Sequence, residues 1–231
     1  ATGGRFDGVL GVVAGLEVLQ TLRDAGVVPA RPMAVAVFTN EEGVRYQPDM
    51  MGSLVFAGAL DLDEALAAKS HDGTLLGEEL QRIGYGGDAP CGAPRPWAYV
   101  ELHIEQGPVL DRLGEVLGAV EDLQGISWQE VIFRGVSNHA GTTPMNLRRD
   151  AGVCAAEVAT FVRGLALRMG RSQVATVGRI EFSPNLVNVI PREARLSIDL
   201  RNTDEGLLRE AEGEVASFIQ AVAVREGVSV E

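Results

Sequence analysis

The stretch Met33-Ala-Val-Ala-Val-Phe-Thr39 is short, apolar and partly β-branched, and it is bounded by Pro32 and Gly43. These features predict a buried strand. In open α/β sheets, ligand sites lie just beyond the carboxyl ends of the strands, which is where Glu41 and Glu42 follow this run. Two adjacent carboxylates repel each other, and a metal ion on one would leave the other free to accept a proton. The alternative is that both are exposed loop residues.

The composition excludes several classes of protein. The chain has 231 residues, 46% of them hydrophobic, a mean hydropathy of +0.09 and a formal net charge of −12. This length allows one large or two modest domains with a sizeable core, and the acidic charge argues against nucleic acid or an anionic membrane as a partner. Cys91 and Cys154 are too few and too far apart for a disulfide framework and fit a reducing cytosol, so we expect a cytoplasmic protein. No run approaches the ~20 apolar residues of a membrane span.

The first part of the chain alternates helical and extended patterns. Apolar residues recur with helical spacing from Gly8 to Leu22, and a strand pattern follows at 33–39, which predicts an α/β layer. The run 97–105 alternates strictly between apolar and polar residues, so it predicts a second strand with His103 on its polar face. Between the two strands we expect three helices and then a Gly- and Pro-rich loop, around residues 50–60, 62–69, 75–83 and 84–96.

A second module begins near Glu121. Its expected elements are strand, helix, strand, strand, helix and strand, at residues 127–134, 150–169, 174–182, 187–201, 203–225 and 228–230. This βαββαβ order predicts a ferredoxin-like unit. We therefore expect an α/β chain of two domains, residues 1–121 and 122–231.

Three places in the first module carry candidate metal ligands. Asp7 lies at a turn before the first helix, Glu41 and Glu42 follow one strand, and His103 lies near the end of another. Carboxylates can bridge two metal ions and imidazole completes a site that suits zinc, manganese or cobalt. The alternatives are that Asp7 caps the helix and that His103 is an ordinary core histidine.

A set of motifs in register makes the metal interpretation more specific. They are Gly4-Arg-Phe-Asp7-Gly-Val-Leu-Gly11, Asn40-Glu-Glu-Gly43, Glu101-Leu-His-Ile-Glu-Gln-Gly-Pro108, Ser137-Asn-His-Ala-Gly-Thr-Thr-Pro-Met145 and Asp199-Leu-Arg-Asn202. In this order they resemble the amidase and carbamoylase branch of the zinc aminoacylase and carboxypeptidase superfamily. That branch includes N-carbamoyl-L-amino acid hydrolases, allantoate amidohydrolases and β-ureidopropionases. The resemblance covers essentially the whole chain and implies part of a zinc-exopeptidase-like catalytic domain followed by a lid and dimerisation domain.

The resemblance implies a two-metal site in the first module. Asp7 would bridge two divalent ions, which are zinc, manganese, cobalt or nickel in this family, with Glu42 on one ion and His103 on the other. Glu41 would be the general base on the shared water. Gln106 matches a position that holds the substrate.

The resemblance also assigns roles in the second module. His139 would reach into the active site of the partner subunit of a homodimer and steady the oxyanion, while Asn188 and Arg201 would hold the substrate, Arg201 by its carboxylate. Arginine suits that role because it binds carboxylates bidentately. The alternatives are that Arg201 forms a surface ion pair with Asp199 or Asp204, that Asn188 is a turn residue and that His139 caps the turn after it. We expect Trp97 and Trp128 to be packing residues. We expect Arg148 and Arg149 to be surface charges at the start of a helix.

Two family features have no counterpart in this sequence. Members carry a His-x-Asp motif upstream of the Asp7 turn and another metal histidine in a C-terminal segment. Each metal would therefore keep two protein ligands here, which makes a weak site. The chain also begins at Ala1 without a methionine and ends at Glu231 within a strand pattern, so a fragment is expected.

The expected function is hydrolysis of an N-carbamoyl-L-amino acid by a dinuclear-metal amidohydrolase. Alternatives within the family are allantoate or another ureide or amide as substrate. Another alternative is an aminopeptidase or dipeptidase of the same superfamily, and the Glu101–Pro108 motif argues against it. The alternative from another class is an inactive, dimerising fragment.

Overall fold

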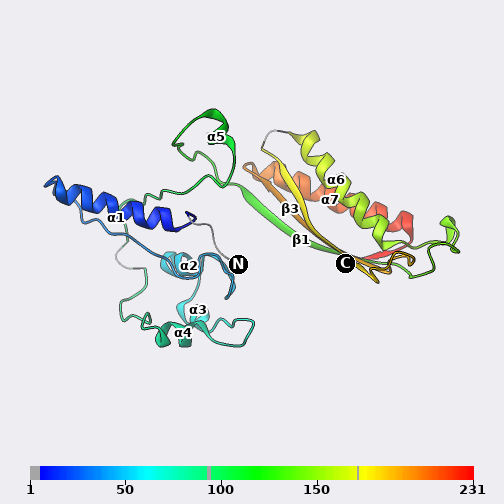
Figure 1. The fold of residues 1–231 in the computed structure, drawn as a ribbon, viewed down its shortest axis with the longest axis horizontal. Helices are drawn as coiled ribbons and strands as arrows, with labels where there is room; N and C mark the ends of the chain where they lie inside the picture. Colours follow the sequence, from blue (N-terminus) through cyan, green and yellow to red (C-terminus); the bar gives the residue numbers. More distant parts are fainter. Residues whose placement is uncertain (1–5, 93–94, 171) are drawn as a thin grey trace. The chain divides into compact units, whose positions relative to one another are not determined.

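The structure is a computed structural model that describes residues 6–92, 95–170 and 172–231 (Figure 1). Gly4 and Arg5 of the first motif lie outside these residues. The chain divides into two compact units, Ala1–Leu117 and Gly118–Glu231. No helix of the described residues is long and apolar enough to cross a membrane.

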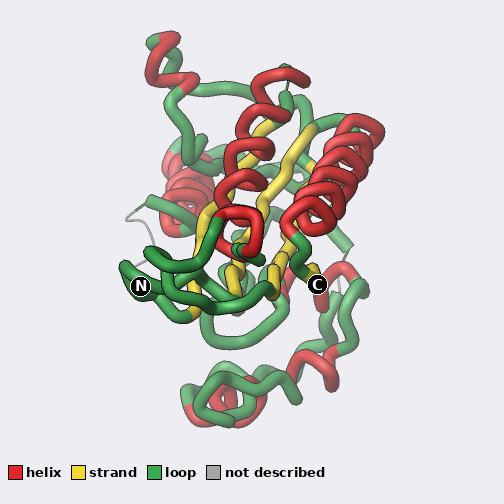
Figure 2. Tube along the Cα trace, turned by 90° about the vertical axis from the view of Figure 1, so that its right-hand side faces the viewer, coloured by secondary structure: helices red, strands yellow, loops and turns green. Residues whose placement is uncertain are grey.

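The second unit is built on a four-stranded antiparallel sheet. Its strands are β1 (Gly125–Arg134), β2 (Val174–Ser183), β3 (Glu193–Asn202) and β4 (Ser229–Val230), in the order β2-β3-β1-β4. Helices α6 (Ala151–Met169) and α7 (Glu205–Glu226) connect them, with a short 3-10 turn at Met145–Leu147. Both helices lie against the same face of the sheet (Figures 1 and 2). The predicted βαββαβ order is therefore observed.

Local sequence signals begin and end these helices. The Asp150 carboxylate accepts hydrogen bonds from the backbone N–H groups of Gly152 and Val153, at 2.9 and 3.2 Å, and so caps α6. Asp204 caps α7 through the N–H of Leu207 at 3.0 Å. Gly227, with φ of 63°, ends α7 in the left-handed conformation that glycine adopts without strain.

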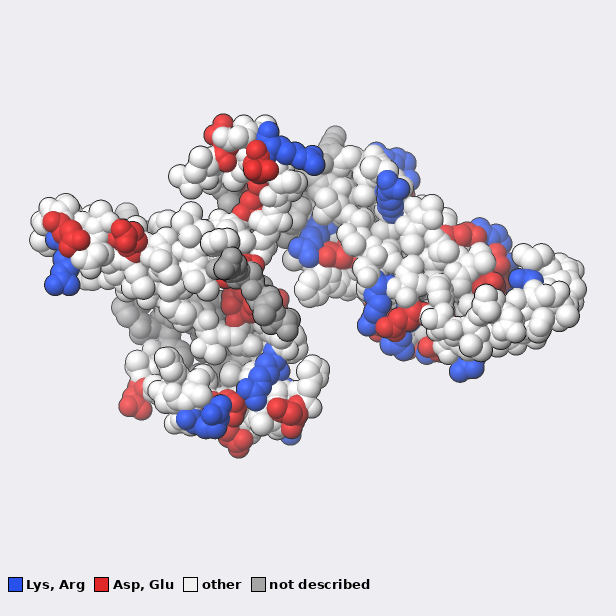
Figure 3. All heavy atoms as spheres, in the orientation of Figure 1, with Lys and Arg blue, Asp and Glu red and all other residues white. Residues whose placement is uncertain are grey.

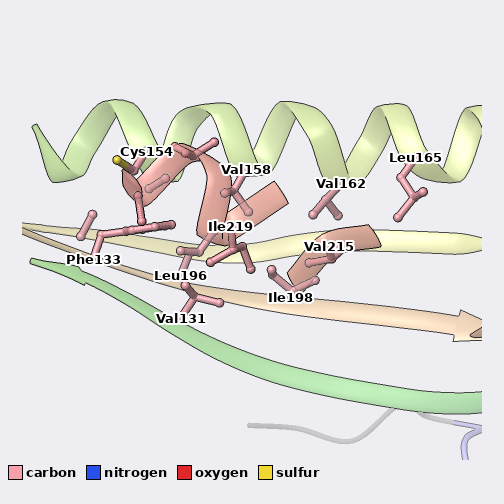
Figure 4. Packing of buried hydrophobic residues seen from close by; sticks show 14 of the residues in the cluster. Val131, Phe133, Cys154, Val158, Val162, Leu165, Leu196, Ile198, Val215 and Ile219 are labelled. Carbon is pink, nitrogen blue, oxygen red and sulfur yellow. The ribbon is translucent and has the colours of Figure 1, made fainter. Parts of the chain in front are cut away.

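The core of the second unit lies between the sheet and its helices. Alternate residues of β3 are almost fully buried: Ala194, Leu196, Ile198 and Leu200. Figure 4 shows Leu196 and Ile198 between the sheet and its helices. Apolar side chains from α6 and α7 pack onto them, including Val158, Val162, Leu165, Val215, Ile219 and Val222. Burying a side chain of this size contributes about 1.5–3 kcal/mol, so this core is sufficient to hold the unit together.

The first unit is made of short helices and extended segments. Its helices are α1 (Val9–Asp24), α2 (Met51–Ala57), α3 (Leu62–Leu66), α4 (Leu76–Arg82) and α5 (Val109–Leu113). A small core joins Tyr46, Met51, Ala65 and Leu76. The 16-residue helix α1 buries none of its side chains against the described residues.

The prediction of two hydrogen-bonded strands in the first unit is wrong. Residues 33–38 and 98–105 belong to no strand, and they form no ladder with any other described segment. Val37 and Val100 are correspondingly exposed. The helix α1 nevertheless crosses both segments, since a Cβ added at Gly11 would lie 2.7 Å from the carbonyl oxygen of Leu102, and one added at Gly15 would lie 3.1 Å from Val35.

Other predictions need smaller corrections. The strand expected from Val187 begins only at Glu193, because residues 188–190 pair with the loop at 138–140 instead. Trp97 and Trp128 do not pack in a core, since 79% and 69% of their surfaces are exposed. Trp97 instead receives the guanidinium of Arg31 over its ring, at 4.7 Å.

Candidate active site

Asp7 does not cap the first helix. The N-cap residue of α1 is Gly8, and no side chain bonds to the helix start. Both carboxylate oxygens of Asp7 face other motif residues: Oδ1 lies 3.2 Å from Nε2 of His103, and Oδ2 accepts a hydrogen bond from Nε2 of Gln106. Residues almost a hundred positions apart in the sequence therefore meet at this carboxylate.

His103 is oriented by its own backbone. Its Nδ1 atom lies 2.7 Å from the carbonyl oxygen of Ile104, so Nδ1 donates a proton there and Nε2 is turned toward Asp7. That backbone hydrogen bond is the largest cause of a raised pKa for His103, and the charges of Asp7, Glu101 and Glu41 add to it while partial burial opposes it. The imidazole therefore directs its Nε2 atom toward a strongly negative region of the first unit.

A closed loop carries Glu41 and Glu42. The backbone N–H groups of Met50, Met51 and Gly52 donate to the carbonyl oxygens of residues 41, 40 and 39, which joins the loop to the start of α2. The side-chain amide of Asn40 donates to the carbonyl oxygens of Tyr46 and Pro48, at 2.8 and 3.2 Å. Both glutamates are exposed, but the backbone that presents them is fixed.

Glu41 lies in the field of the other candidate ligands. Partial desolvation is the largest cause of its raised pKa, and the charges of Glu42, Asp7 and Asp49 raise the pKa further, whereas His103 lowers it. The pKa of Glu41 therefore responds to the charges of Asp7 and His103. Asp49 was not predicted, because it carries no motif signal of its own.

The donor atoms fit part of a divalent-cation site. One imidazole nitrogen and one carboxylate meet at Asp7 and His103, and these are donors that zinc and manganese take in proteins. Within residues 6–92, 95–170 and 172–231, however, no three or more His, Cys, Asp or Glu side chains are arranged closely enough to hold an ion. The donor atoms are of the right type for a divalent cation, but too few of them converge to hold one.

The Glu101–Pro108 motif has both chemical and structural parts. Gln106 adopts a left-handed backbone conformation, with φ of 57°, and its amide reaches Asp7. Glu105 accepts hydrogen bonds from the N–H groups of Val109 and Leu110, each at 2.8 Å, and so anchors the start of α5. Glu105 was not predicted as a capping residue, although an acidic residue just before a helix is a known capping signal.

Two of the motif residues in the second unit, His139 and Asn188, lie close together beyond one end of the sheet. His139 forms an isolated bridge with Val189, and the N–H of Ala140 donates to the carbonyl oxygen of Asn188 at 2.9 Å. Nδ1 of His139 accepts a hydrogen bond from the N–H of Gly141 at 3.1 Å. The capping alternative is thus correct, and it fixes Nε2 as the protonated, donor nitrogen of the neutral ring.

Arg148 is more than a surface charge. Its guanidinium donates to the carbonyl oxygens of Ala140 and Thr143, at 2.7 and 3.1 Å, and the residue is half-buried. It therefore fixes the loop that carries His139. The sequence places Arg148 a few residues after this motif but gives no signal of the contact.

Arg201 lies on the sheet face that the helices leave open. Its Nε and Nη2 atoms donate to the carboxylate of Asp199, at 2.8–3.1 Å, as the ion-pair alternative predicted. The hydrogen bonds from Arg201 are the main cause of a lowered pKa for Asp199, with a smaller contribution from the side chain of Trp128, which is paired with Asp199 across the sheet.

Arg201 and His139 lie at opposite ends of β3. Arg201 pairs with Ile126 at the start of β1, whereas Glu193 pairs with Arg134, the last residue before the loop that carries His139. A strand rises about 3.3 Å per residue, so the two ends of β3 are roughly 26 Å apart. One small substrate cannot contact both residues of the same chain.

Comparison with known proteins gives one consistent family. The family described as Peptidase family M20/M25/M40 matches residues 2–230. An N-carbamoyl-L-amino-acid amidohydrolase from Rhizobium meliloti is 40% identical over 98% of this chain and 55% of its own length. An N-carbamoyl-L-amino acid amidohydrolase from Geobacillus stearothermophilus is 43% identical over 87% of this chain and 49% of its own length. The chain spans about half the length of the curated relatives it matches.

A solved structure agrees with these relatives. The crystal structure of an amidase of the hydantoinase/carbamoylase family from Burkholderia multivorans superposes with a TM-score of 0.94 at 43% identity. The match covers 100% of this chain and 56% of that one. The α/β fold, with its zinc-exopeptidase-like first part, is therefore the fold of this family.

Proposed function

The chain belongs to peptidase family M20/M25/M40, and on that premise we propose that the complete protein hydrolyses the carbamoyl C–N bond of N-carbamoyl-L-amino acids. The products are the amino acid, carbon dioxide and ammonia. The observation that carries this proposal is the double engagement of Asp7, by His103 and Gln106, beside Glu41. The relatives named as carbamoyl-amino-acid amidohydrolases support the choice of substrate class.

Hydrolases of this family generally use divalent metal ions, and the donor set around Asp7 suits them. We assign Asp7 as the bridging ligand of two ions, with Glu42 on one and His103 on the other. When bound, such ions lower the pKa of water and polarise a carbonyl group. The identity of the ions follows supply as much as ligand chemistry, and zinc, manganese, cobalt and nickel are the candidates.

The proton transfers are assigned to Glu41. Its carboxylate lies in the field of the Asp7 and His103 pair, with a raised pKa, and a raised pKa makes a carboxylate a stronger base, better matched to taking a proton from water near neutral pH. Glu41 takes a proton from the attacking water and returns it to the leaving nitrogen. Gln106 holds the substrate beside Asp7.

Residues 1–121 are assigned as the metal-binding catalytic domain and 122–231 as the lid and dimerisation domain. His139 and Arg201 lie at opposite ends of β3, which supports a homodimer in which His139 serves the site of the partner subunit. There the protonated Nε2 of His139 would donate to the developing oxyanion, while Asn188 and Arg201 hold the substrate.

The base assignment is tested with Glu41→Gln in the complete protein. We expect turnover of N-carbamoyl-L-amino acids to fall roughly 10²- to 10⁴-fold, because a general base contributes about that much, with unchanged metal content. Glu78→Gln, an exposed glutamate in the first turn of α4, is the matched control and should keep full activity. Normal turnover by Glu41→Gln would remove the base assignment.

The substrate class is tested with a panel of carbamoyl amino acids, allantoate and dipeptides. Cleavage of carbamoyl amino acids above the others supports the proposal. Cleavage of dipeptides without any ureide turnover would overturn it. Residues 1–231 alone are expected to bind metal weakly and to show negligible turnover, and robust activity would contradict the low ligand count.

The shared site is tested by mixing subunits. Glu41→Gln and His139→Ala homodimers should each be inactive, but a mixed dimer contains one site with an intact Glu41 and an intact His139 from its partner. Random mixing should then restore roughly a quarter of the wild-type activity, as expected for a two-fold dimer. No restoration, in a preparation in which exchange of subunits is verified, would contradict the shared site.

A further inference from the structure

The open face of the sheet in the second unit carries an arginine near one end of its central strand, β3. On β3 the buried side chains of Leu196 to Leu200 alternate with Ser197, Asp199 and Arg201, which project from the face opposite to α6 and α7. In the register of the sheet, Arg201 has Ile126 of β1 on one side and Val174 of β2 on the other.

Asp199 holds only one edge of this arginine. The Nε and Nη2 atoms donate to Asp199, whereas Nη1 has no hydrogen-bond partner in the described part of the chain. A guanidinium carries five N–H groups, and its other edge, formed by Nη1 and Nη2, can bind a second carboxylate bidentately. Asp199 therefore orients Arg201 without occupying the edge that a ligand would use.

The surroundings of that edge are apolar. Ile126, Val174 and Trp128 are 51%, 49% and 69% exposed. Single exposed apolar residues are ordinary on protein surfaces, but these three adjoin one guanidinium in the register of a single sheet face. Trp128 is the largest, and it stands directly opposite Asp199 in the register of β1 and β3. Its side chain therefore lies on the same sheet face as Arg201, one register position away.

We propose that Trp128 is a specificity-determining residue, whose indole face receives the apolar side chain of a substrate whose α-carboxylate is bound by the free edge of Arg201, and that Asp199 is the positioning residue for the arginine. This inference rests on the proposed function. It narrows the substrate class to N-carbamoyl amino acids with aliphatic or aromatic side chains. The charge of the carboxylate is complementary to Arg201, and the indole, Ile126 and Val174 remove the neighbouring side chain from water.

The kinetic test compares N-carbamoyl-L-leucine with N-carbamoylglycine in the complete enzyme. Trp128→Ala should lower kcat/KM for the leucine substrate about 10-fold or more relative to the glycine substrate, since an apolar pocket contact discriminates by roughly 10- to 200-fold. An equal fall for both substrates, or no fall for either, would overturn the assignment. Val224→Ala removes an exposed apolar residue from α7, on the helical side of the sheet, and should leave the ratio unchanged.

A second pair of variants separates the contact made by the Trp128 ring from the positioning role of Asp199. Trp128→Phe keeps a flat apolar ring but cannot bond to Asp199, so it should retain most of the leucine preference. Asp199→Asn should raise KM for both substrates with little change in their ratio. A loss of the ratio in Asp199→Asn with an unchanged KM would contradict the division of roles.

A binding measurement keeps this inference separable from the reaction. Residues 1–231 contain two tryptophans, so the emission of Trp97→Phe is compared with that of the double variant Trp97→Phe/Trp128→Phe, and the difference between the two reports Trp128 alone. N-acetyl-L-leucine should change the Trp128 emission, whereas N-acetyl-L-leucinamide, which lacks the carboxylate, should not. A carbamoylase without this response contradicts the inference alone. The response without carbamoylase activity contradicts the proposed function alone.

Discussion

The two units differ in how much of each element they bury. The 19-residue helix α6 buries a full stripe of side chains, from Ala151 to Leu165, whereas the 16-residue helix α1 buries none against the described residues. Their apolar content is similar, because both helices carry valine, leucine and alanine at helical spacing. The difference therefore lies in the partners that each helix meets.

The sheets explain that difference. In the second unit every strand finds its neighbours within about a hundred residues, and β1 and β3 pair along their whole lengths. In the first unit the segments 33–38 and 98–105 have no paired strand among the described residues, so the face that α1 needs is incomplete. Extended pattern alone does not make a sheet, because strand stability comes from neighbours.

The surface charges do not distinguish the units in the same way. On the face shown in Figure 3, acidic and basic side chains are interspersed, and no single basic patch gathers there. Several pairs are short-range bridges within one unit, such as Arg45 with Glu79 and Arg134 with Glu193. Such exposed pairs contribute little free energy, so burial decides which unit is stable.

Hydrogen exchange on residues 1–231 should show the largest contrast. The amides of β1 and β3 should exchange only by global unfolding, whereas those of α1 should exchange by local opening. With a global stability of about 5–15 kcal/mol, the two classes should differ by at least about three orders of magnitude in protection. Equal protection of α1 and β3 would mean that the first unit has a core the structure does not show.

Leucine truncations test the same contrast through side chains. Leu165→Ala in α6 should lower the free energy of unfolding by about 2–5 kcal/mol, because the residue is fully buried. Leu16→Ala in α1, which is 55% exposed, should change it by less than about 0.5 kcal/mol. Urea denaturation followed by circular dichroism measures both changes.

The control for the leucine pair lies on α6 itself. Leu167 is two residues from Leu165 but is 73% exposed, so Leu167→Ala should resemble Leu16→Ala. If Leu16→Ala lowered the free energy of unfolding as much as Leu165→Ala does, α1 would pack as firmly as α6. That result would contradict the difference between the two units.

The sequence predicts the second unit well for a physical reason. The alternation on β3 and the helical spacing of α6 and α7 are local signals, and all their packing partners lie within the same module. The start of β3 was missed because residues 188–190 pair with the loop at 138–140 instead of the sheet. That competition depends on tertiary contacts, which a periodic pattern does not contain.

The sequence predicted which residues form the candidate site better than it predicted how they are arranged. Asp7 and His103 stood out by residue type and motif, and the structure brings them together. The roles of Arg148 and Glu105 were not predicted, because their partners are backbone groups that no side-chain pattern reveals. Trp128 was placed in a core because tryptophan is highly buried on average, whereas it lies on the open face of the sheet.

Helix caps extend the comparison to a smaller effect. Asp150 caps α6 and Asp61 caps α3, each by accepting two backbone N–H groups. Asp150→Ala should cost about 1 kcal/mol in the main unfolding transition. Asp61→Ala should leave that transition unchanged, because α3 belongs to the weakly buried unit. Thermal denaturation of both variants decides between them, and an equal shift of Tm would contradict the separation.

The smallest expected effect is a pH dependence confined to the second unit. The hydrogen bonds from Arg201 lower the pKa of Asp199 in the folded state, so its stabilising contribution is complete above the unfolded value of about 3.9 and is lost as the pH falls through the lower folded value. The pair is partly exposed, and we expect well under about 1 kcal/mol. Asp199→Asn should therefore flatten the fall of the urea midpoint below about pH 4.

Glu79 of the first unit is the matched case, because hydrogen bonds from Arg82 and Arg45 lower its pKa to about 2. Its ion pairs lie at the surface and in the weakly buried unit, so Glu79→Gln should leave the acid limb of the main transition unchanged. If Glu79→Gln flattened that limb as Asp199→Asn does, the first unit would unfold together with the second. The contrast between the two regions would then lie in burial alone and not in cooperativity.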